Sequence, residues 1–345
     1  MKKSKGITIY DIAKKLNLAA STVSRGLQDS PEIGKKTKKR IVETAEKMGY
    51  SANLTARSLR QQQSETIGVI VHQLNSNFVN SVLAGIERVT TEAGYDILIA
   101  HSSESYVKEV ANAKNLFHRR VDGVISSLSL ETMDLEHFRA FAERNVPVVY
   151  FDRVEQEENS TAVVIDNVKC GYVATQHLIQ QGCKRIVHVT ASLNRNVYSQ
   201  RYEGYRKALA EHKLEFSDDL LIIDDHSERA AMDAAMKILQ MNPRPDGVFV
   251  TSDFVAAFCM RTLRQHGISI PDTIAFVGFN NDPICKLIEP TLTTIDYPGK
   301  DIGEIAARNL ISHLKGLSNI NRTNNITVRS DLIVRESSVR SRDPE

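Results

Sequence analysis

Short apolar runs separated by helix-length stretches fill the chain from residue 66 onward, and this alternation constrains the possible folds most. The runs lie at 67–71, 95–101, 121–128 and 146–152, and then at 162–166, 185–190, 220–224, 246–252 and 274–279. Apolar strands that alternate with amphipathic helices predict buried parallel sheets with right-handed crossovers. The two series predict two lobes, and the similar tetrapeptides VDGV (121–124) and PDGV (245–248) suggest an internal duplication.

The first 63 residues are far more basic than the rest of the chain. They contain 14 Lys and Arg against 5 Asp and Glu, a net charge of +9, whereas the remainder contains 30 against 37, a net charge of −7. A small basic module joined to a larger acidic one is typical of nucleic-acid-binding proteins. From composition alone, a solvated basic tail is the alternative.

Helical spacing in this basic segment argues against a disordered tail. Thr8 can cap a first helix, and Asp11 three residues later can close a capping box. A second helix starts at Ala20 or the residue after it, and a third spans about 35–48 and ends at Gly49, which supplies the backbone freedom of a C-cap. The apolar residues expected to face inward are Ile9, Ile12, Ala13, Leu16, Val23, Leu27, Ile41, Val42, Ala45 and Met48.

The first two helices have the spacing of a helix-turn-helix, whose second helix enters the major groove of DNA. Its expected exposed residues, Ser21, Thr22, Ser24 and Arg25, can all donate hydrogen bonds to phosphates or bases. Val23 is expected to be buried against the first helix. The sequence therefore predicts a DNA-reading surface at 20–25.

The runs TIYDIAKKLNLAASTVSRGL, KKTKKRIVETAEKMGY and SANLTARSLR resemble the DNA-binding region of the lactose-repressor (LacI) family over residues 8–60. By this resemblance, Ala20, Ser21 and Arg25 match positions that read bases, and Thr22 and Ser24 match positions that contact phosphates. The full set of DNA contacts that it implies is Thr8, Tyr10, Ala20, Ser21, Thr22, Ser24, Arg25, Asn53, Ala56 and Leu59.

Residues 51–60 are too few for a stable isolated helix. The resemblance implies a hinge helix that orders on operator DNA, with Leu59 wedged into the minor groove, where apolar side chains unstack a base step. A core leucine in the linker is the alternative for Leu59. The predicted division is a helix-turn-helix domain at 1–50, a hinge and linker at 51–65, and an effector-binding and dimerisation domain at 66–342.

The segment 66–337 resembles the family's periplasmic-binding-protein-like domain through runs such as IGVIV, RRVDGVI, VVYFDR and PTLTTID. The resemblance implies an α/β domain with parallel sheets in two lobes, which the chain connects three times. The late strands 292–296 and 326–337 are then expected to return to the first and the second lobe. The predicted first lobe is about 66–163 and 294–324, and the second is about 164–293 and 325–342.

Ligands of open α/β sheets bind beyond the carboxyl ends of the strands, and here these ends are expected to face one cleft. Asp, Asn and Arg side chains suit a polyol, because they supply charged donors and acceptors to hydroxyls. Strand ends and resemblance together predict effector contacts at His72, Phe78, Asp152, Arg195, Arg201, His226, Asp253 and Asn280.

Several of these assignments have alternatives. Arg195 could be a surface charge, His226 a loop histidine, and Asp253 the N-cap of the helix that follows. Asn280 replaces the aspartate that is most common in the family, which could suit an acidic sugar, because a ligand carboxylate facing an aspartate would be repelled.

Enzyme classes with recognisable motifs are excluded. The chain has no GxGxxG after a strand, no GxxxxGK[ST], no GxSxG and no HExxH. Its four cysteines are widely spaced, as in reduced proteins without a zinc site, and we expect no metal and no cofactor. No run of about 18 apolar residues occurs, so we expect no signal peptide or membrane span, and a cytoplasmic protein. A solute-binding protein of a sugar transporter is therefore disfavoured.

The sequence predicts a transcription regulator, and more narrowly a repressor of a carbohydrate-utilisation operon. Its expected partners are a pseudo-palindromic DNA operator, a sugar or sugar derivative in the cleft between the lobes, and a second copy in a homodimer. A purine-type regulator that needs a corepressor is the alternative.

Overall fold

The computed structural model describes residues 7–50, 63–155, 161–322 and 325–340. The chain separates into two compact units, residues 1–64 and 65–345. The predicted DNA contacts Asn53, Ala56 and Leu59 lie outside the described residues, as does most of the predicted hinge.

In its described residues, the first unit contains the three helices that the spacing predicted. They are α1 (Ile9–Leu16), α2 (Ala20–Leu27) and α3 (Lys35–Met48). The predicted capping box is confirmed, because the backbone N–H of Thr8 donates to the Asp11 carboxylate at 2.8 Å. Asn17 and Gly49 end α1 and α3 in the left-handed conformation, which lets the cap N–H groups reach the last helical carbonyls.

A small apolar core holds these helices together. Ile12, Val23 and Ile41 are fully buried, and Ala45 packs with them. The prediction that Val42 faces inward was wrong, since 41% of this residue is exposed. Ile41 and Ala45 lie on one face of α3, and the next residue after Ile41 is turned about 100° away from that face.

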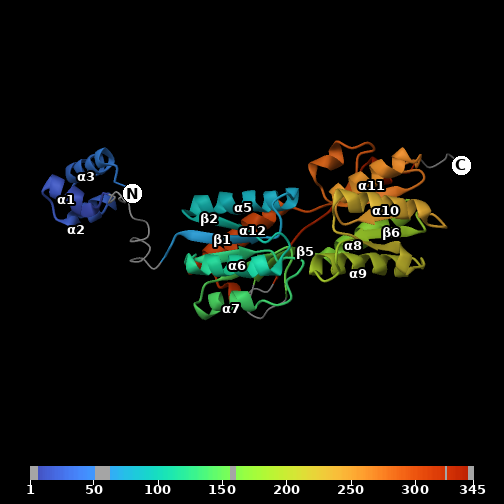
Figure 1. Cartoon of the computed structure of the whole chain (residues 1–345), viewed down its shortest axis with the longest axis horizontal. Coiled ribbons are helices and arrows are strands. Elements are labelled where there is room, and N and C mark those ends of the chain that lie inside the picture. Colours follow the sequence, from blue (N-terminus) through green and yellow to red (C-terminus); the bar gives the residue numbers. More distant parts are fainter. Residues whose placement is uncertain (1–6, 51–62, 156–160, 323–324, 341–345) are drawn as a thin grey trace, which may run out of the picture. The chain divides into compact units, whose positions relative to one another are not determined.

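The first lobe of the second unit, which carries the labels β1, β2 and β5 in Figure 1, is built on a sheet whose strands are all parallel. In spatial order they are β11 (Asn325–Val328), β5 (Thr161–Ile165), β4 (Val148–Phe151), β3 (Gly123–Ser126), β1 (Thr66–Val71) and β2 (Asp96–His101). Its helices are α5 (Asn77–Ala93), α6 (Tyr106–His118), α7 (Glu136–Glu143) and α12 (Gly299–Leu314). Helices α5 and α12 pack closely, because a Cβ at Gly85 would lie 2.2 Å from the carbonyl oxygen of Lys300.

The second lobe has a similar sheet, parallel except for one edge strand. In spatial order its strands are β12 (Leu332–Ile333), β10 (Thr293–Asp296), β9 (Ala275–Asn280), β8 (Gly247–Val250), β6 (Ile186–Thr190) and β7 (Leu221–Ile223), with β12 antiparallel to β10. Its helices are α8 (Asn167–Gln180), α9 (Asn196–Glu211), α10 (Glu228–Gln240) and α11 (Asp253–Gln265). The 3₁₀ turns of the second unit are η1 (Asp218–Leu220), η2 (Pro283–Lys286), η3 (Ile320–Arg322) and η4 (Glu336–Ser338).

Three strands lie in a different lobe from the predicted one. Strand β5, assigned to the second series, pairs with β4 in the first sheet. Strand β10, expected in the first lobe, pairs with β9 in the second sheet. Strand β11, expected in the second lobe, pairs with β5. The chain therefore changes lobe after β5, β10 and β11, because non-local partner strands, which no local pattern specifies, decide sheet membership.

Within the described part of the chain, no helix combines the length and apolar character that crossing a membrane requires.

Candidate functional site

Helix α2 presents a polar outer surface in the first unit. Ser21 and Arg25 are exposed, and Ala20, Thr22 and Ser24 are half-buried. Buried Val23 anchors the opposite side of the helix in the core, so Ser21 and Arg25 face away from it, whereas Ala20 packs partly against the core.

Arg25 is already oriented by a neighbour. Its Nη1 donates to Oε2 of Glu32 at 2.8 Å, although both side chains are largely exposed. Two other predicted contacts lie on α1 or at its start. Tyr10 is 70% exposed, and Thr8 is exposed while it caps the helix.

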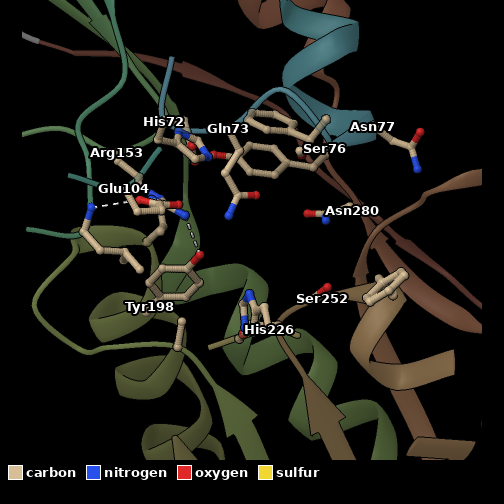
Figure 2. A pocket seen from close by; sticks show the side chains of 18 of the residues that line it. His72, Gln73, Ser76, Asn77, Glu104, Arg153, Tyr198, His226, Ser252 and Asn280 are labelled. Atoms are coloured by element: carbon tan, nitrogen blue, oxygen red, sulfur yellow. Dashed lines mark hydrogen bonds and ion pairs between the residues drawn. The ribbon is translucent and has the colours of Figure 1, made fainter. Parts of the chain in front are cut away.

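The second unit contains a cavity of about 370 Å³ between its lobes (Figure 2). Six of the eight predicted effector residues line it: His72, Phe78, Asp152, Arg201, His226 and Asn280. They follow or flank the carboxyl ends of strands from both sheets, as parallel topology requires. Among the described residues, no three His, Cys, Asp or Glu side chains gather as a metal site.

Asp152 is fixed by hydroxyl groups. The Tyr297 hydroxyl donates to its Oδ1 at 2.7 Å, and the Ser127 hydroxyl lies 3.4 Å from its Oδ2. Burial raises the pKa of Asp152, and Arg153 and Tyr297 oppose this shift. The carboxylate is therefore partnered before any ligand arrives.

Aromatic rings hold the Arg201 side chain. Its guanidinium carbon lies 3.6 Å from the Phe279 ring centroid, and its Nε donates to Oδ1 of Asn167 at 2.9 Å. Phe78 stacks on Tyr297 with ring centroids 4.0 Å apart. The planar guanidinium and these rings form a rigid wall, which suits a ligand that offers both hydroxyls and an apolar face.

The two pocket histidines are neutral at physiological pH. Burial, with help from Arg153 and Arg201, lowers the pKa of His226 to about 3. Burial and Arg153 also lower the pKa of His72 well below its ordinary value. His72 Nδ1 lies 3.1 Å from the Ser127 hydroxyl, so neutral rings with fixed partners face the cavity.

Two predicted effector residues do not line the cavity. Arg195 is buried between the lobes, where its guanidinium donates to the carbonyl oxygen of Thr132. Asp253 is fully buried, and its carboxylate accepts hydrogen bonds from the Thr294 hydroxyl at 2.6 Å and the Asp282 N–H at 2.8 Å. Asp253 is not the N-cap of α11 either, because Ser252 occupies that position.

The predicted effector set left out other residues of the cavity wall. Arg153 directly follows Asp152 at the same strand end as the predicted site, and Tyr198 lies three residues before Arg201 on α9, so helical spacing could have indicated it. Glu104 follows β2 with no such signal. The remaining lining residues are Gln73, Asn75, Ser76, Asn77, Leu130, Ala191, Val197, Asp225, Ser227, Thr251, Ser252, Phe254, Asp282 and Tyr297.

Asp282 is an unusual lining residue. Only 9% of it is exposed, and burial together with the charge of Asp253 raises its pKa to about 7. The carboxyl is therefore about half protonated near neutral pH, in contrast to Asp225, whose pKa the Ser227 hydroxyl and N–H lower.

Known proteins share both units. The profile of bacterial regulatory proteins of the lacI family matches residues 8–53, and the profile of the periplasmic binding protein-like domain matches residues 175–338. The HTH-type transcriptional regulator RegA of Clostridium saccharobutylicum is 30% identical over 336 residues, which cover 96% of this chain and 99% of RegA. Catabolite control protein A of Priestia megaterium is 29% identical, and the match covers 89% of this chain and 92% of that protein.

A solved complex of the transcriptional regulator CelR with cellobiose has the same architecture. It superposes with a TM-score of 0.73 at 26% sequence identity, and the match covers 96% of this chain and 99% of the CelR chain. These relatives are transcription regulators, and each matches this chain over nearly its full length.

The Asp282→Asn variant should be more stable than the wild type at pH 8 and no more stable at pH 4. In the folded protein the pKa is raised from 3.8 to about 7, so stability falls as pH rises between these values, where the folded state binds the extra proton. The expected gain in the free energy of unfolding above pH 7 is up to about 4 kcal/mol, measured by urea denaturation. Asp225→Asn is the control, with the opposite sign; a gain of equal size at both pH values would contradict the assignment.

Proposed function

The chain belongs to the lacI family of bacterial regulatory proteins, and we propose on this basis that it represses transcription from an operator whose affinity an uncharged sugar controls. The arrangement of polar, self-neutralised groups in the cleft of the second unit carries this proposal. A protein that acts on operator DNA works in the cytoplasm, and we infer that localisation.

Helix α2 supports DNA reading by the first unit. Ser21 and Arg25 extend from the side opposite the buried Val23, and the half-buried Thr22 and Ser24 flank them, while Ala20 is half-buried against the core. An arginine can read guanine through two hydrogen bonds, whereas short hydroxyl side chains suit phosphates and base edges. The net charge of +9 in residues 1–63 supplies the attraction to the DNA backbone.

The cleft suits an uncharged polyhydroxyl ligand. The Arg153 charge is balanced by Glu104, Asp152 accepts from Tyr297, and both histidines are neutral. Amide and hydroxyl groups make up much of the remaining wall: Gln73, Asn75, Ser76, Asn77, Thr251, Ser252 and Asn280. Such groups bind hydroxyls without demanding a ligand charge, and a related regulator is solved with cellobiose. A sugar acid is the other class that the chemistry of Arg201 and Asn280 would accept.

Effector binding would act on DNA affinity by linkage. The cavity wall comes from both lobes, so a ligand contacts both and favours the lobe arrangement that fits it best. Operator affinity then changes by the ligand's differential affinity for the two arrangements.

We propose a homodimer formed through the second unit. An apolar groove there is lined by Ala257, Phe258, Ile284, Leu287 and Ile288, with a volume of about 660 Å³. Leu287 is 81% exposed. Exposed apolar grooves of this kind mark protein interfaces, and a second copy would also supply the second half-site contact that palindromic operators require.

Arg25→Ala should weaken specific operator binding by roughly 1–3 kcal/mol, because it removes a bidentate base contact. Lys47→Ala removes one positive charge from the last turn of α3 and is the control. Binding to operator and to scrambled DNA is measured by fluorescence anisotropy at fixed salt. Equal losses for both variants would show that Arg25 contributes charge only.

Arg201→Ala should abolish the effector response while operator binding remains, since its guanidinium lines the cavity and lies in the second unit. Arg206→Ala, on the exposed side of the same helix, is the control. A panel of neutral sugars including cellobiose, with the matching sugar acids, is screened by thermal shift, because a ligand of the folded state raises its stability. Retained binding in Arg201→Ala would remove Arg201 from the site.

Leu287→Glu should raise the dimer dissociation constant at least about tenfold, because it places a charge in a buried apolar interface. Leu317→Glu changes a leucine of similar exposure, 78%, outside the groove and should leave the dimer intact. Sedimentation velocity across micromolar concentrations distinguishes the two. A wild-type chain that sediments as a monomer would overturn the dimer.

A further inference from the structure

Several contacts between the lobes do not involve the segments on which the chain crosses. On the second lobe they come from residues 191–198, at the start of α9. On the first lobe they come from the segments after β3 and β4, at 128–132 and 152–154. Each contact joins two protein groups, so none of them requires a ligand.

The Arg153 side chain makes the central contact. Its Nη2 donates to the Tyr198 hydroxyl at 2.9 Å, and its Nη1 donates to both oxygens of Glu104 at 2.9 and 2.7 Å (Figure 2). Only 5% of Arg153 and of Tyr198 is exposed. The guanidinium is thus held by its own lobe and extended to the other, out of water, where charge-assisted hydrogen bonds are strong.

Asn196 adds two hydrogen bonds to the backbone after β4. Its Oδ1 accepts from the Val154 N–H at 3.0 Å, and its Nδ2 donates to the Asp152 carbonyl oxygen at 3.1 Å. The Val154 amide is therefore protected by a residue of the opposite lobe.

The segment after β3 provides the third contact. Leu130 packs against Ala191, Val197 and Tyr198. Two residues further on, the carbonyl oxygen of Thr132 accepts a hydrogen bond from Arg195. This explains the burial of Arg195, which the sequence placed in the effector site.

Two glutamates hold these first-lobe segments in position. Oε2 of Glu104 accepts from the Leu130 N–H at 2.9 Å as well as from Arg153. Glu109, which is fully buried, accepts from the Ser129 N–H at 2.7 Å and the Thr132 hydroxyl at 2.9 Å.

We propose that Arg153, Tyr198, Arg195, Asn196 and Leu130 form an interlobe clasp that keeps the cleft closed and must open for the effector to enter or leave. Glu104 is its positioning residue, because its side chain accepts hydrogen bonds from Arg153 and the Leu130 N–H, both of the first lobe, and so orients them. This inference rests on the proposed function in one respect: it takes the ligand of the cleft to be an effector. The clasp regulates access to that same cavity and the rate at which its occupant exchanges.

Hydrogen exchange in the full chain without DNA or sugar tests the clasp. The variant is Tyr198→Phe, which removes the acceptor of Arg153 and keeps the packing ring. Its matched control is Tyr202→Phe on the same helix, where the lost hydroxyl accepts from exposed Arg206 at 3.0 Å. The hydrogen-exchange rate of the Val154 amide is divided by the exchange rate of the core amides of β4, so that the effect of global destabilisation cancels in the ratio.

We expect Tyr198→Phe to raise this ratio about tenfold or more, the effect of losing a hydrogen bond to a charged group, and Tyr202→Phe to leave it unchanged. An unchanged ratio in Tyr198→Phe, or an equal rise in both variants, overturns the clasp. Operator binding is measured on the same preparations, so a chain that binds no operator contradicts the proposed function without altering the exchange result.

Glu104→Gln tests the positioning role. We expect it to raise the same ratio, and the double variant with Tyr198→Phe to add little, because both changes act through Arg153. Additive effects would mean that Glu104 acts on the Val154 segment independently of Arg153, and an unchanged ratio in Glu104→Gln would mean that it acts on general stability alone. Either result would overturn its role in the clasp.

Discussion

The ion pair between Arg153 and Glu104 joins a buried guanidinium to a carboxylate whose side chain is 20% exposed, and much of the cleft is arranged around it. Removing one partner of a buried pair leaves the other charge unpaired, at a cost of about 3–5 kcal/mol. The same requirement explains why Asp152 accepts from Tyr297 and why the histidines are neutral. The wall that remains is polar but nearly self-neutralised, which favours hydroxyl-bearing ligands over strongly charged ones.

Backbone geometry aims several of these side chains. Asp152, His226, Asn280 and Asn281 all have positive φ values, of 59°, 60°, 123° and 59°. Residues other than glycine adopt this region at a cost of order 1 kcal/mol each and persist there only when their surroundings fix them. Asn281 shows such fixing, since its side chain bonds to Asp296 at 2.8 Å and to Arg335 at 2.7 Å. Left-handed turns after the strands thus direct side chains into the cleft.

The DNA-reading unit has the opposite organisation. Its core is small, with Ile12, Val23 and Ile41 as the fully buried residues, and its polar surface is held by short-range devices such as the Thr8–Asp11 capping box. A small core leaves the outer residues of α2 free to contact a partner. In the second unit, function is enclosed between lobes and depends on contacts between residues far apart in the sequence.

Local chemistry explains what the sequence determined by itself. The capping residues and Gly49 set the ends of the first-unit helices, and the alternation of apolar runs predicted two sheets that are parallel except for β12. Residues next to strand ends, such as Asp152 and Asn280, could be placed in the cleft because parallel strands end on the same side. The tertiary structure alone decided that β5 and β11 pair, that Arg195 and Asp253 have structural partners, and that Glu104 positions Arg153. Those outcomes depend on contacts between segments that lie far apart in the sequence, and the local spacing of residues does not specify such contacts.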